Sequence, residues 1–294
     1  MTSSSSAAPP PPPRPIKLLM LHGYTQSGPL FHSKTGALRK SLQKAFPAGC
    51  HFVYPTAPTR LRPADETFLG EKDGGEEKEE EEEEELDAWA WWRRTDTSTS
   101  TSTSTGAGET YVYQGLEEGL SAIAGVLRDQ GPFDGVVGFS QGGAAAGMVA
   151  SLLEEGRKEA FEARYARGGM RFPEAFEKGH PPLRFAVSYS GFALSAGGDT
   201  NPYRAFYEPK IKTKMLHFLG MQDVVVDEAR SLALVEACEH TGDRFVVYHP
   251  GGHFLPSTQK ASVNALIAFI KDVLHGEEGA KKEEESVEDM HVPF

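Results

Sequence analysis

Cysteines are scarce in this sequence, and long hydrophobic runs are absent from it. The two cysteines, Cys50 and Cys238, are too few for a disulfide framework and fit no metal cluster, which favours a reducing compartment. No stretch approaches the roughly 20 apolar residues of a membrane span. Residues 1–15 contain a run of five prolines instead of the apolar core of a signal peptide. We therefore expect a soluble protein of the cytoplasm, or also of the nucleus, without a membrane span.

Basic residues are also fewer than acidic ones. The chain has 42 aspartates and glutamates and 30 lysines and arginines, which gives a net charge of −12. The excess is local, since eleven acids lie within residues 71–85 and seven within residues 276–294. The remainder is almost neutral, so we expect both runs to be solvated and disordered, with an interaction tail as the alternative. Nothing in this distribution indicates a nucleic-acid partner, and the sequence does not specify an oligomeric state.

The length of 294 residues suits one large α/β domain better than two small ones, because no linker divides the chain. We expect this domain to span residues 16–275. The segments expected to be disordered are the Pro/Ser-rich terminus 1–15, the acidic and Ser/Thr-rich insertions 71–85 and 95–109, and the acidic tail 276–294. Residues 156–182, which mix basic and aromatic side chains, form either a cap over a site or a surface excursion.

The sequence Gly138-Phe139-Ser140-Gln141-Gly142 has the Gly-x-Ser-x-Gly spacing of a nucleophile elbow. A short apolar run, residues 133–139, precedes Ser140, and small residues follow it, so the pattern predicts a strand, a tight turn and a helix. The two glycines allow the strand and the helix to approach closely. The turn directs the backbone N–H of Gln141 toward an oxyanion beside the serine. A Gly-rich turn without chemistry is the alternative.

A loop rich in glycine and hydroxyl residues, 22–28, follows the first predicted strand, residues 16–21. Open α/β sheets place their ligand sites at the carboxyl ends of the strands. In α/β hydrolases this loop supplies the second N–H of the oxyanion hole, so we assign that role to the backbone of Tyr24 and Thr25. An ordinary strand-to-helix connection is the alternative.

Asp223 follows the predicted strand 214–220 and is our candidate for the acid that orients a catalytic histidine. An acid among the first loop residues after a late strand is typical of α/β hydrolases. Asp227 is the competing acid. It directly precedes the predicted helix 228–240, where a carboxylate caps free N–H groups.

His253 is the candidate general base. It follows two glycines in the loop 250–256, after the last predicted strand, residues 244–249. The glycines leave the imidazole mobile and unhindered, and the chain order Ser140, Asp223, His253 is that of α/β hydrolases. His249 is the alternative, although its place in the strand favours packing.

All three tryptophans of the sequence lie within residues 86–94, between the two low-complexity tracts. So concentrated a group of aromatic side chains must be buried against something. Trp91 and Trp92 either anchor the segment to the domain or bind the substrate at the mouth of an acyl cleft. The remaining predicted elements are helices at 30–46, 113–128, 144–154 and 258–274 and strands at 50–54 and 185–191.

Together these residues resemble the FSH family of serine hydrolases, within the α/β-hydrolase superfamily. The resemblance rests on residues 21–27, 34–39, the Trp91-Trp92 pair, and residues 133–143 and 251–253. It implies an α/β-hydrolase fold, with a mostly parallel central sheet and helices on both faces. It also implies a triad of Ser140, Asp223 and His253 that cleaves the ester or thioester bond of small-molecule acyl substrates through a covalent acyl-enzyme. The sequence contains no metal-binding motif, and we expect neither a metal nor a cofactor.

Two other functions stay open at this point. Acyl-protein thioesterases share the elbow Gly-Phe-Ser-Gln-Gly-Gly, but that family favours Gly-Asp after His-Gly, where this chain has Tyr24-Thr25-Gln26. A non-catalytic binding module that acts through its acidic tracts is the alternative from another class. The intact set of candidate catalytic residues argues against it.

Overall fold

A computed structural model describes residues 14–62, 87–96, 111–177, 179–195 and 201–288, with side chains in the last helix described as far as residue 276. Most of the segment 1–15, the whole of 71–85 and most of 95–109 lie outside the described residues. The predicted disorder of these segments therefore stays a prediction.

Six parallel strands form the central sheet, in the order β10-β9-β8-β7-β1-β2. They are β1 (Ile16–Leu21), β2 (Cys50–Val53), β7 (Gly135–Phe139), β8 (Phe185–Tyr189), β9 (Lys214–Gly220) and β10 (Val246–His249). The central strands are nearly continuous apolar runs, because both faces of a parallel sheet are covered. In the register of the sheet, Val136 lies between Leu19 and Ala186.

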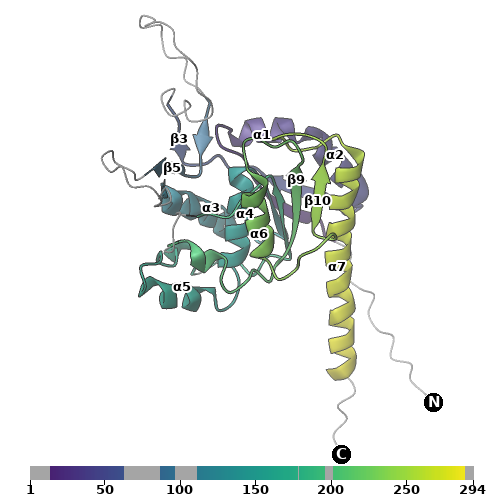
Figure 1. The fold of residues 1–294 in the computed structure, drawn as a ribbon. Helices are drawn as coiled ribbons and strands as arrows, with labels where there is room; N and C mark the ends of the chain where they lie inside the picture. Colours follow the sequence, from purple (N-terminus) through teal and green to yellow (C-terminus); the bar gives the residue numbers. More distant parts are fainter. Residues whose placement is uncertain (1–13, 63–86, 97–110, 178, 196–200, 289–294) are drawn as a thin grey trace, which may run out of the picture.

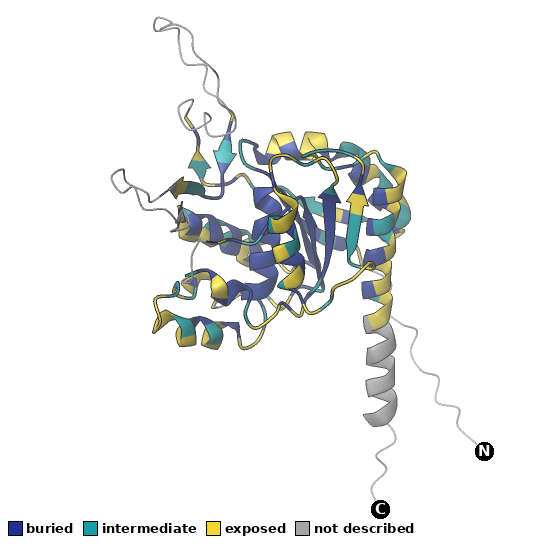
Figure 2. Cartoon of the chain, in the orientation of Figure 1, coloured by how far each residue is buried: buried dark blue, intermediate teal, exposed yellow. Residues whose placement is uncertain are grey.

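Helices cover both faces of the sheet (Figure 1). One face carries α1 (Gly28–Lys34), α2 (Gly36–Ala45) and α7 (Lys260–Glu288), and the other carries α3 (Leu116–Gln130), α4 (Gln141–Leu152) and α6 (Glu228–Glu236). Alternate residues of β1 show the division, since Leu18 and Met20 face the first group and Leu19 and Leu21 the second. Burying each such side chain stabilises the fold by roughly 1.5–3 kcal/mol. Figure 2 shows the buried sheet between the two layers, as the predicted fold class requires.

Two short antiparallel pairs attach the tryptophan-rich segment to the domain. They are β3 (Thr59–Arg60) with β4 (Trp89–Ala90) and β5 (Arg93–Asp96) with β6 (Tyr111–Gln114). Tyr113 therefore lies in a strand, and the prediction of a helix over 113–128 is wrong at its start. Gly115, with φ of 78°, separates β6 from α3.

Helix boundaries differ from the prediction in further places, among them the end of α6 at Glu236 instead of residue 240. The expected helix 30–46 is divided at Thr35, whose Oγ1 donates to the Phe31 carbonyl oxygen at 2.8 Å and so ends α1. At the other end of the chain, α7 continues to Glu288. Part of the acidic tail 276–294, predicted to be disordered, is therefore helical, in keeping with the high helix propensity of glutamate and lysine.

The insertion 156–182 contains α5 (Arg157–Tyr165) and the 3₁₀ turn η3 (Glu174–Phe176). Phe161 of α5 packs edge-on against Phe172 and against Phe206 of η4 (Arg204–Phe206). The insertion starts after the end of α4 and ends before the start of β8. Figure 1 accordingly shows α5 away from the arrowheads of β9 and β10. This placement matches the surface-excursion alternative and not a cap over the carboxyl ends of the strands.

Candidate active site

Ser140 ends β7 and precedes α4, as the elbow pattern predicts. Its backbone has φ of 53° and ψ of −116°, a conformation that non-glycine residues rarely adopt and that costs roughly 1–3 kcal/mol. Glycines make the turn sterically feasible. A Cβ on Gly138 would lie 1.9 Å from the Gly142 carbonyl oxygen, and one on Gly142 would lie 2.1 Å from the Leu21 carbonyl oxygen.

The structure brings Ser140, Asp223 and His253 together from three loops, although Ser140 and His253 are 113 residues apart. His253 Nε2 lies 2.9 Å from Ser140 Oγ, and His253 Nδ1 lies 2.8 Å from Asp223 Oδ2. With Nδ1 donating its proton to the carboxylate, Nε2 is left to accept the serine proton. A relay of this geometry can deprotonate a serine hydroxyl as its oxygen attacks an electrophile.

Asp223 is held as a carboxylate by its surroundings. Burial raises its pKa, but hydrogen bonds from the Val226 N–H and from His253 outweigh burial, so the pKa lies below its ordinary value. The second carboxylate oxygen, Oδ1, accepts from the Val225 nitrogen at 3.0 Å and from the Val226 nitrogen at 2.9 Å. These bonds fix the carboxylate plane and therefore the orientation of the imidazole.

Asp227 and His249, the alternative candidates for the acid and the base, each have a structural role. Asp227 Oδ1 accepts from the Ala229 nitrogen at 2.7 Å and caps α6, which confirms the predicted capping role. His249 is 1% exposed at the end of β10, with its ring 5.1 Å from that of Phe254. Burial lowers the pKa of His249, partly offset by the charge of Asp223. His249 therefore packs as a neutral side chain, as its place in the strand predicts.

The loop after β1 lies against the elbow. A Cβ on Gly23 would come within 2.9 Å of the Phe139 ring, and the Gln26 nitrogen donates to the Gly23 carbonyl oxygen at 3.2 Å. Thr25, one of the two residues predicted to supply an oxyanion amide, has φ of 63°. Gln141, predicted to supply the first oxyanion amide beside those of Tyr24 and Thr25, is the first residue of α4, so its N–H has no acceptor within the helix.

His22 holds this loop from within the core. Burial lowers its pKa to about 4, so the imidazole is neutral. Its Nδ1 lies 2.8 Å from the Gly23 carbonyl oxygen, and its Nε2 accepts from the Ala57 nitrogen at 3.0 Å. The two bonds together assign the proton to Nδ1, because Nε2 must accept. His22 thus ties the start of the loop to the segment after β2.

A protein family described as Serine hydrolase (FSH1) matches residues 13–265 of this chain. The chain belongs to the FSH1 family of serine hydrolases. This agrees with the resemblance that the elbow, the first loop and the Gly-Gly-His segment carry. FSH1 membership makes the protein a hydrolase of the serine type.

Curated relatives extend the match to most of the chain. Esterase OVCA2 of Danio rerio is 30% identical over 244 residues, which are 83% of this chain and 91% of that protein. Family of serine hydrolases 3 of Saccharomyces cerevisiae is 29% identical over 257 residues, 87% of this chain and 84% of that protein. A protein of Schizosaccharomyces pombe named Dihydrofolate reductase is 33% identical over 243 residues, but this chain spans only 44% of its length. The esterases among these relatives support ester hydrolysis in general.

Among solved structures, that of esterase PE8 matches with a TM-score of 0.52 at 15% identity, covering 88% of this chain and 93% of that one. At this identity the likeness concerns the fold, which is that of an α/β hydrolase. Within the part of the chain that the structure describes, no helix is long and apolar enough to cross a membrane.

Trp91 and Trp92, predicted to bind substrate or to anchor their segment, are 0% and 2% exposed. Both indoles lie in the core layer that contains Leu120 of α3 and Ala144 of α4. Neither therefore presents surface to a substrate. The packing alternative, and not the acyl cleft, describes their environment in this FSH1 protein.

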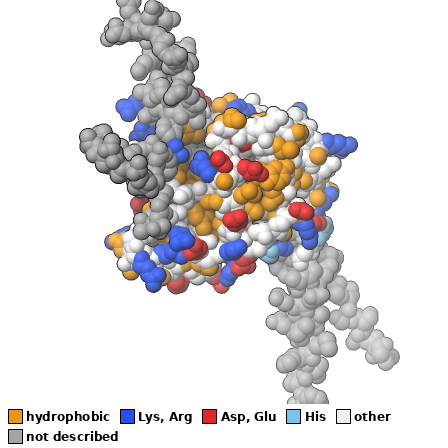
Figure 3. Space-filling model, viewed as in Figure 1, with side chains coloured by type: hydrophobic (Ala, Val, Ile, Leu, Met, Phe, Trp, Pro, Cys, Tyr) orange, Lys and Arg blue, Asp and Glu red, His pale blue; other side chains and the backbone are white. Residues whose placement is uncertain are grey.

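An exposed apolar rim, which we define as Met221, Val224, Val225 and Phe254, borders the relay. These side chains are 70%, 94%, 47% and 42% exposed, and they flank Asp223 and His253 in the sequence. Figure 3 shows hydrophobic side chains gathered on the face that carries α6 and β10. The predicted site residues do not include this rim, although apolar residues in loops that are usually polar are a readable signal.

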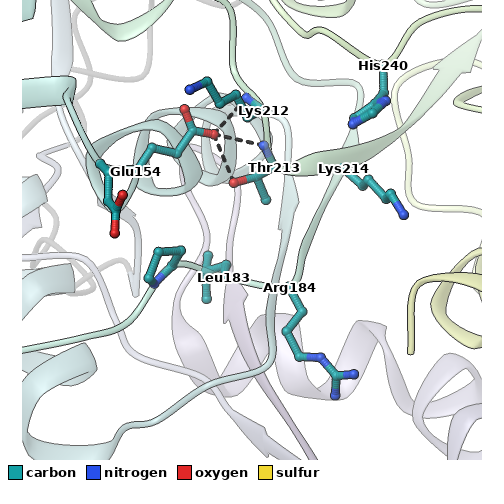
Figure 4. Close-up of a pocket in the computed structure, with 9 residues that line it drawn as sticks. Glu154, Leu183, Arg184, Lys212, Thr213, Lys214 and His240 are labelled. Atoms are coloured by element: carbon teal, nitrogen blue, oxygen red, sulfur yellow. Dashed lines mark hydrogen bonds between the residues drawn. The ribbon is translucent and has the colours of Figure 1, made fainter. Parts of the chain in front are cut away.

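A cavity of about 360 Å³ lies at the other ends of the strands, against Leu183 before β8 and Thr213 before β9 (Figure 4). Of the two acids that line it, Glu154 is already satisfied, because its Oε1 accepts from the Lys212 and Thr213 nitrogens, each at 2.8 Å. The other carboxylate oxygen accepts from Arg157 at 2.8 Å. These polar groups are committed to one another, and they are remote from the elbow.

Proposed function

We propose that this FSH1 protein hydrolyses carboxylic esters or thioesters of acyl substrates through a Ser140, Asp223 and His253 triad and a covalent acyl-enzyme. The observation that carries the proposal is the unbroken relay from Ser140 Oγ through the imidazole to the Asp223 carboxylate, with both links under 3 Å at 2.9 and 2.8 Å. The relay begins at Ser140, whose backbone is strained, and strained backbone conformations cluster at functional sites.

In the first half of the reaction, Ser140 Oγ attacks the acyl carbonyl carbon while its proton passes to His253 Nε2. Asp223 stabilises the imidazolium that results. The carbonyl oxygen becomes an oxyanion, which the N–H groups of Gln141 and of Tyr24 or Thr25 bind. When the tetrahedral intermediate collapses, the bond to the alcohol or thiol breaks, and the leaving group takes the proton from Nε2.

In the second half, water takes the place of the serine hydroxyl. His253 Nε2 removes a proton from the water as its oxygen attacks the acyl-enzyme, and the ester bond to Ser140 Oγ breaks with return of the proton to that oxygen. The carboxylic acid leaves and the free enzyme is restored. The exposed apolar rim beside His253 favours substrates whose acyl or alcohol part is apolar over charged ones.

A fluorophosphonate probe tests the proposal directly, because it phosphonylates only an activated serine with loss of fluoride. We expect the intact mass of the wild-type chain to increase by one adduct and that of Ser140→Ala to stay unchanged. Hydrolysis rates on matched oxygen esters and thioesters then rank the two bond types. An unlabelled wild-type protein, or a labelled Ser140→Ala variant, would overturn the proposal and favour the non-catalytic binding module.

A further inference from the structure

The segment 87–92, here called the tryptophan segment, runs beside the loop that follows β1. Asp87 Oδ2 accepts from the Ser27 hydroxyl at 2.6 Å, and Trp89 forms an antiparallel bridge with Gln26. The Trp89 indole N–H donates to the other oxygen of Asp87 at 2.8 Å. These contacts attach the start of the tryptophan segment to Gln26 and Ser27 at the end of this loop.

Trp91 joins that loop to the elbow. Its indole N–H donates to the His22 carbonyl oxygen at 3.0 Å, and its ring centroid lies 5.1 Å from that of His22. Its backbone N–H donates to Gln141 Oε1 at 2.8 Å, and Gln141 Nε2 donates to the Trp92 carbonyl oxygen at 2.7 Å. All of these bonds are buried, so water does not compete for them.

We propose that Trp91 is a positioning residue, which holds the N–H of Gln141 and the N–H groups of Tyr24 and Thr25 at a fixed separation around the oxyanion. This inference rests on the proposed function. The indole of Trp91 bonds to the backbone of His22, at the start of the loop that supplies one proposed donor, and its peptide N–H bonds to the side chain of Gln141, whose own backbone N–H is the other. Oxyanion donors act through preorganisation, and displacements well under 1 Å reduce their effect.

Close packing holds Trp91 and its hydrogen-bond partners in place. A Cβ on Gly119 of α3 would lie 2.1 Å from the Trp91 carbonyl oxygen, so α3 presses directly on the back of this residue. On the elbow side, a Cβ on Gly142 would lie 2.6 Å from the His22 carbonyl oxygen, which is the acceptor of the indole bond. Helix, loop and elbow thus meet at Trp91 without room for a second arrangement.

Trp92 provides a matched control. It is as deeply buried as Trp91, in the same core layer. It bonds to Gln141 only through its backbone carbonyl, a bond that any side chain retains. Among the described residues its indole donates no hydrogen bond to the loop after β1. Replacement of either tryptophan by phenylalanine removes a similar volume, but only at Trp91 does it remove a bond to that loop.

The test compares Trp91→Phe with Trp92→Phe in steady-state ester hydrolysis. We expect kcat of Trp91→Phe to fall about tenfold, less than the 10²–10³ lost when an oxyanion donor is removed outright, with KM within about twofold. The affinity for an alkyl boronic acid, whose tetrahedral serine adduct mimics the intermediate, should fall by the same factor. Trp92→Phe should keep both quantities within about twofold, and its melting temperature should also fall, but less than that of Trp91→Phe, which leaves the buried His22 carbonyl without its indole donor.

Gln141→Met is the second variant. It removes both side-chain bonds from residue 141 to the tryptophan segment and keeps the backbone N–H of residue 141. It should reproduce the loss of kcat and of boronic acid affinity, and the loss in the double variant with Trp91→Phe should be less than the product of the two. Equal kcat and boronic acid affinity in the two phenylalanine variants, or a loss of kcat without a loss of boronic acid affinity, would overturn this inference. A wild-type protein that neither takes the fluorophosphonate nor hydrolyses esters would instead overturn the proposed function.

Discussion

The two ends of the parallel sheet are built on opposite principles. At the amino ends of the strands, the buried carboxylates are paired: Asp134 accepts from Arg14 at 2.6 Å and from the Lys17 nitrogen at 2.9 Å, and Glu154 accepts from Arg157 at 2.8 Å. No backbone strain at a non-glycine residue occurs there in the described part of the chain. These contacts stabilise the fold and leave no group ready to react.

At the carboxyl ends the reverse holds. The three non-glycine residues with positive φ among the described residues are Thr25, Ser140 and Ser190, and they follow β1, β7 and β8. The apolar rim is exposed there, and the relay ends on a hydroxyl rather than on a paired charge. Strain and exposure concentrated at one end, with stability at the other, are what a scaffold that carries a reactive site requires.

The largest effect that this comparison predicts is at Ser140. Ser140→Ala should lower kcat by a factor on the order of 10⁶, as loss of a triad nucleophile does, because no other group can form the acyl-enzyme. The free energy of unfolding should change by less than about 1 kcal/mol, since the serine side chain carries no core packing. Ester hydrolysis and denaturant unfolding measure the two quantities, and retention of more than about a hundredth of the activity would contradict the assignment.

The next effect separates two aspartates four residues apart. Asp223→Asn should lower kcat by a factor on the order of 10⁴, because an amide favours the wrong imidazole tautomer. Asp227→Asn is the matched control, and its activity should stay within about twofold, since asparagine also caps a helix. Steady-state kinetics at a single pH decide the matter. Similar activities in the two variants would show that Asp223 does not orient His253.

A third prediction concerns stability at the amino ends. Arg157→Met leaves the buried Glu154 carboxylate without its partner and should lower the free energy of unfolding by about 3 kcal/mol. Lys158→Met, one residue on, removes a pair with Glu177 whose side chains are 47% and 38% exposed, and should cost less than about 1 kcal/mol. Urea unfolding gives both values, while kcat per labelled chain should match the wild type. A loss of kcat in Arg157→Met would mean that the two ends are coupled.

The smallest effect is one that the two ends share. Burial lowers the pKa of His22 to about 4 and that of His217 to about 3, and it also lowers the pKa of His180, whose Nε2 accepts from the Phe133 nitrogen at 2.7 Å. These folded-state pKa values lie below the unfolded value of about 6.5, so the unfolded chain binds more protons. The stability that the neutral rings contribute is complete above about pH 6.5 and declines as the pH falls below it.

Each of these histidines adds up to about 1.4 kcal/mol per pH unit to that decline. Urea unfolding between about pH 7 and pH 5 should show it, and His180→Gln, whose amide oxygen can accept the same N–H, should reduce the slope. His51→Gln, on the exposed side of β2, is the control and should leave the slope unchanged. Equal slopes in both variants and the wild type would rule out His180 as a proton-linked group.

Elements whose causes are local could be predicted from the residues alone. The strained turn at Ser140 depends on Gly138 and Gly142, which are within two residues of it, and the apolar runs that precede Ser140 and Asp223 mark strands without knowledge of their partners. In a parallel sheet the residues just after several strands necessarily share one edge. The grouping of Ser140, Asp223 and His253 was therefore predictable, and their separations in the structure agree with it.

Features that depend on contacts between distant segments follow from the assembled fold and not from any local pattern. Composition could not say whether Trp91 faced a cleft or the core, because that depends on α3 closing over Gly119 and on the side chain of Gln141 reaching the segment from 50 residues away. The placement of the insertion 156–182 and the exposure of the apolar rim were undecidable for the same reason. Burial is a property of the assembled layers, and no local pattern of residues encodes which layer a side chain will meet.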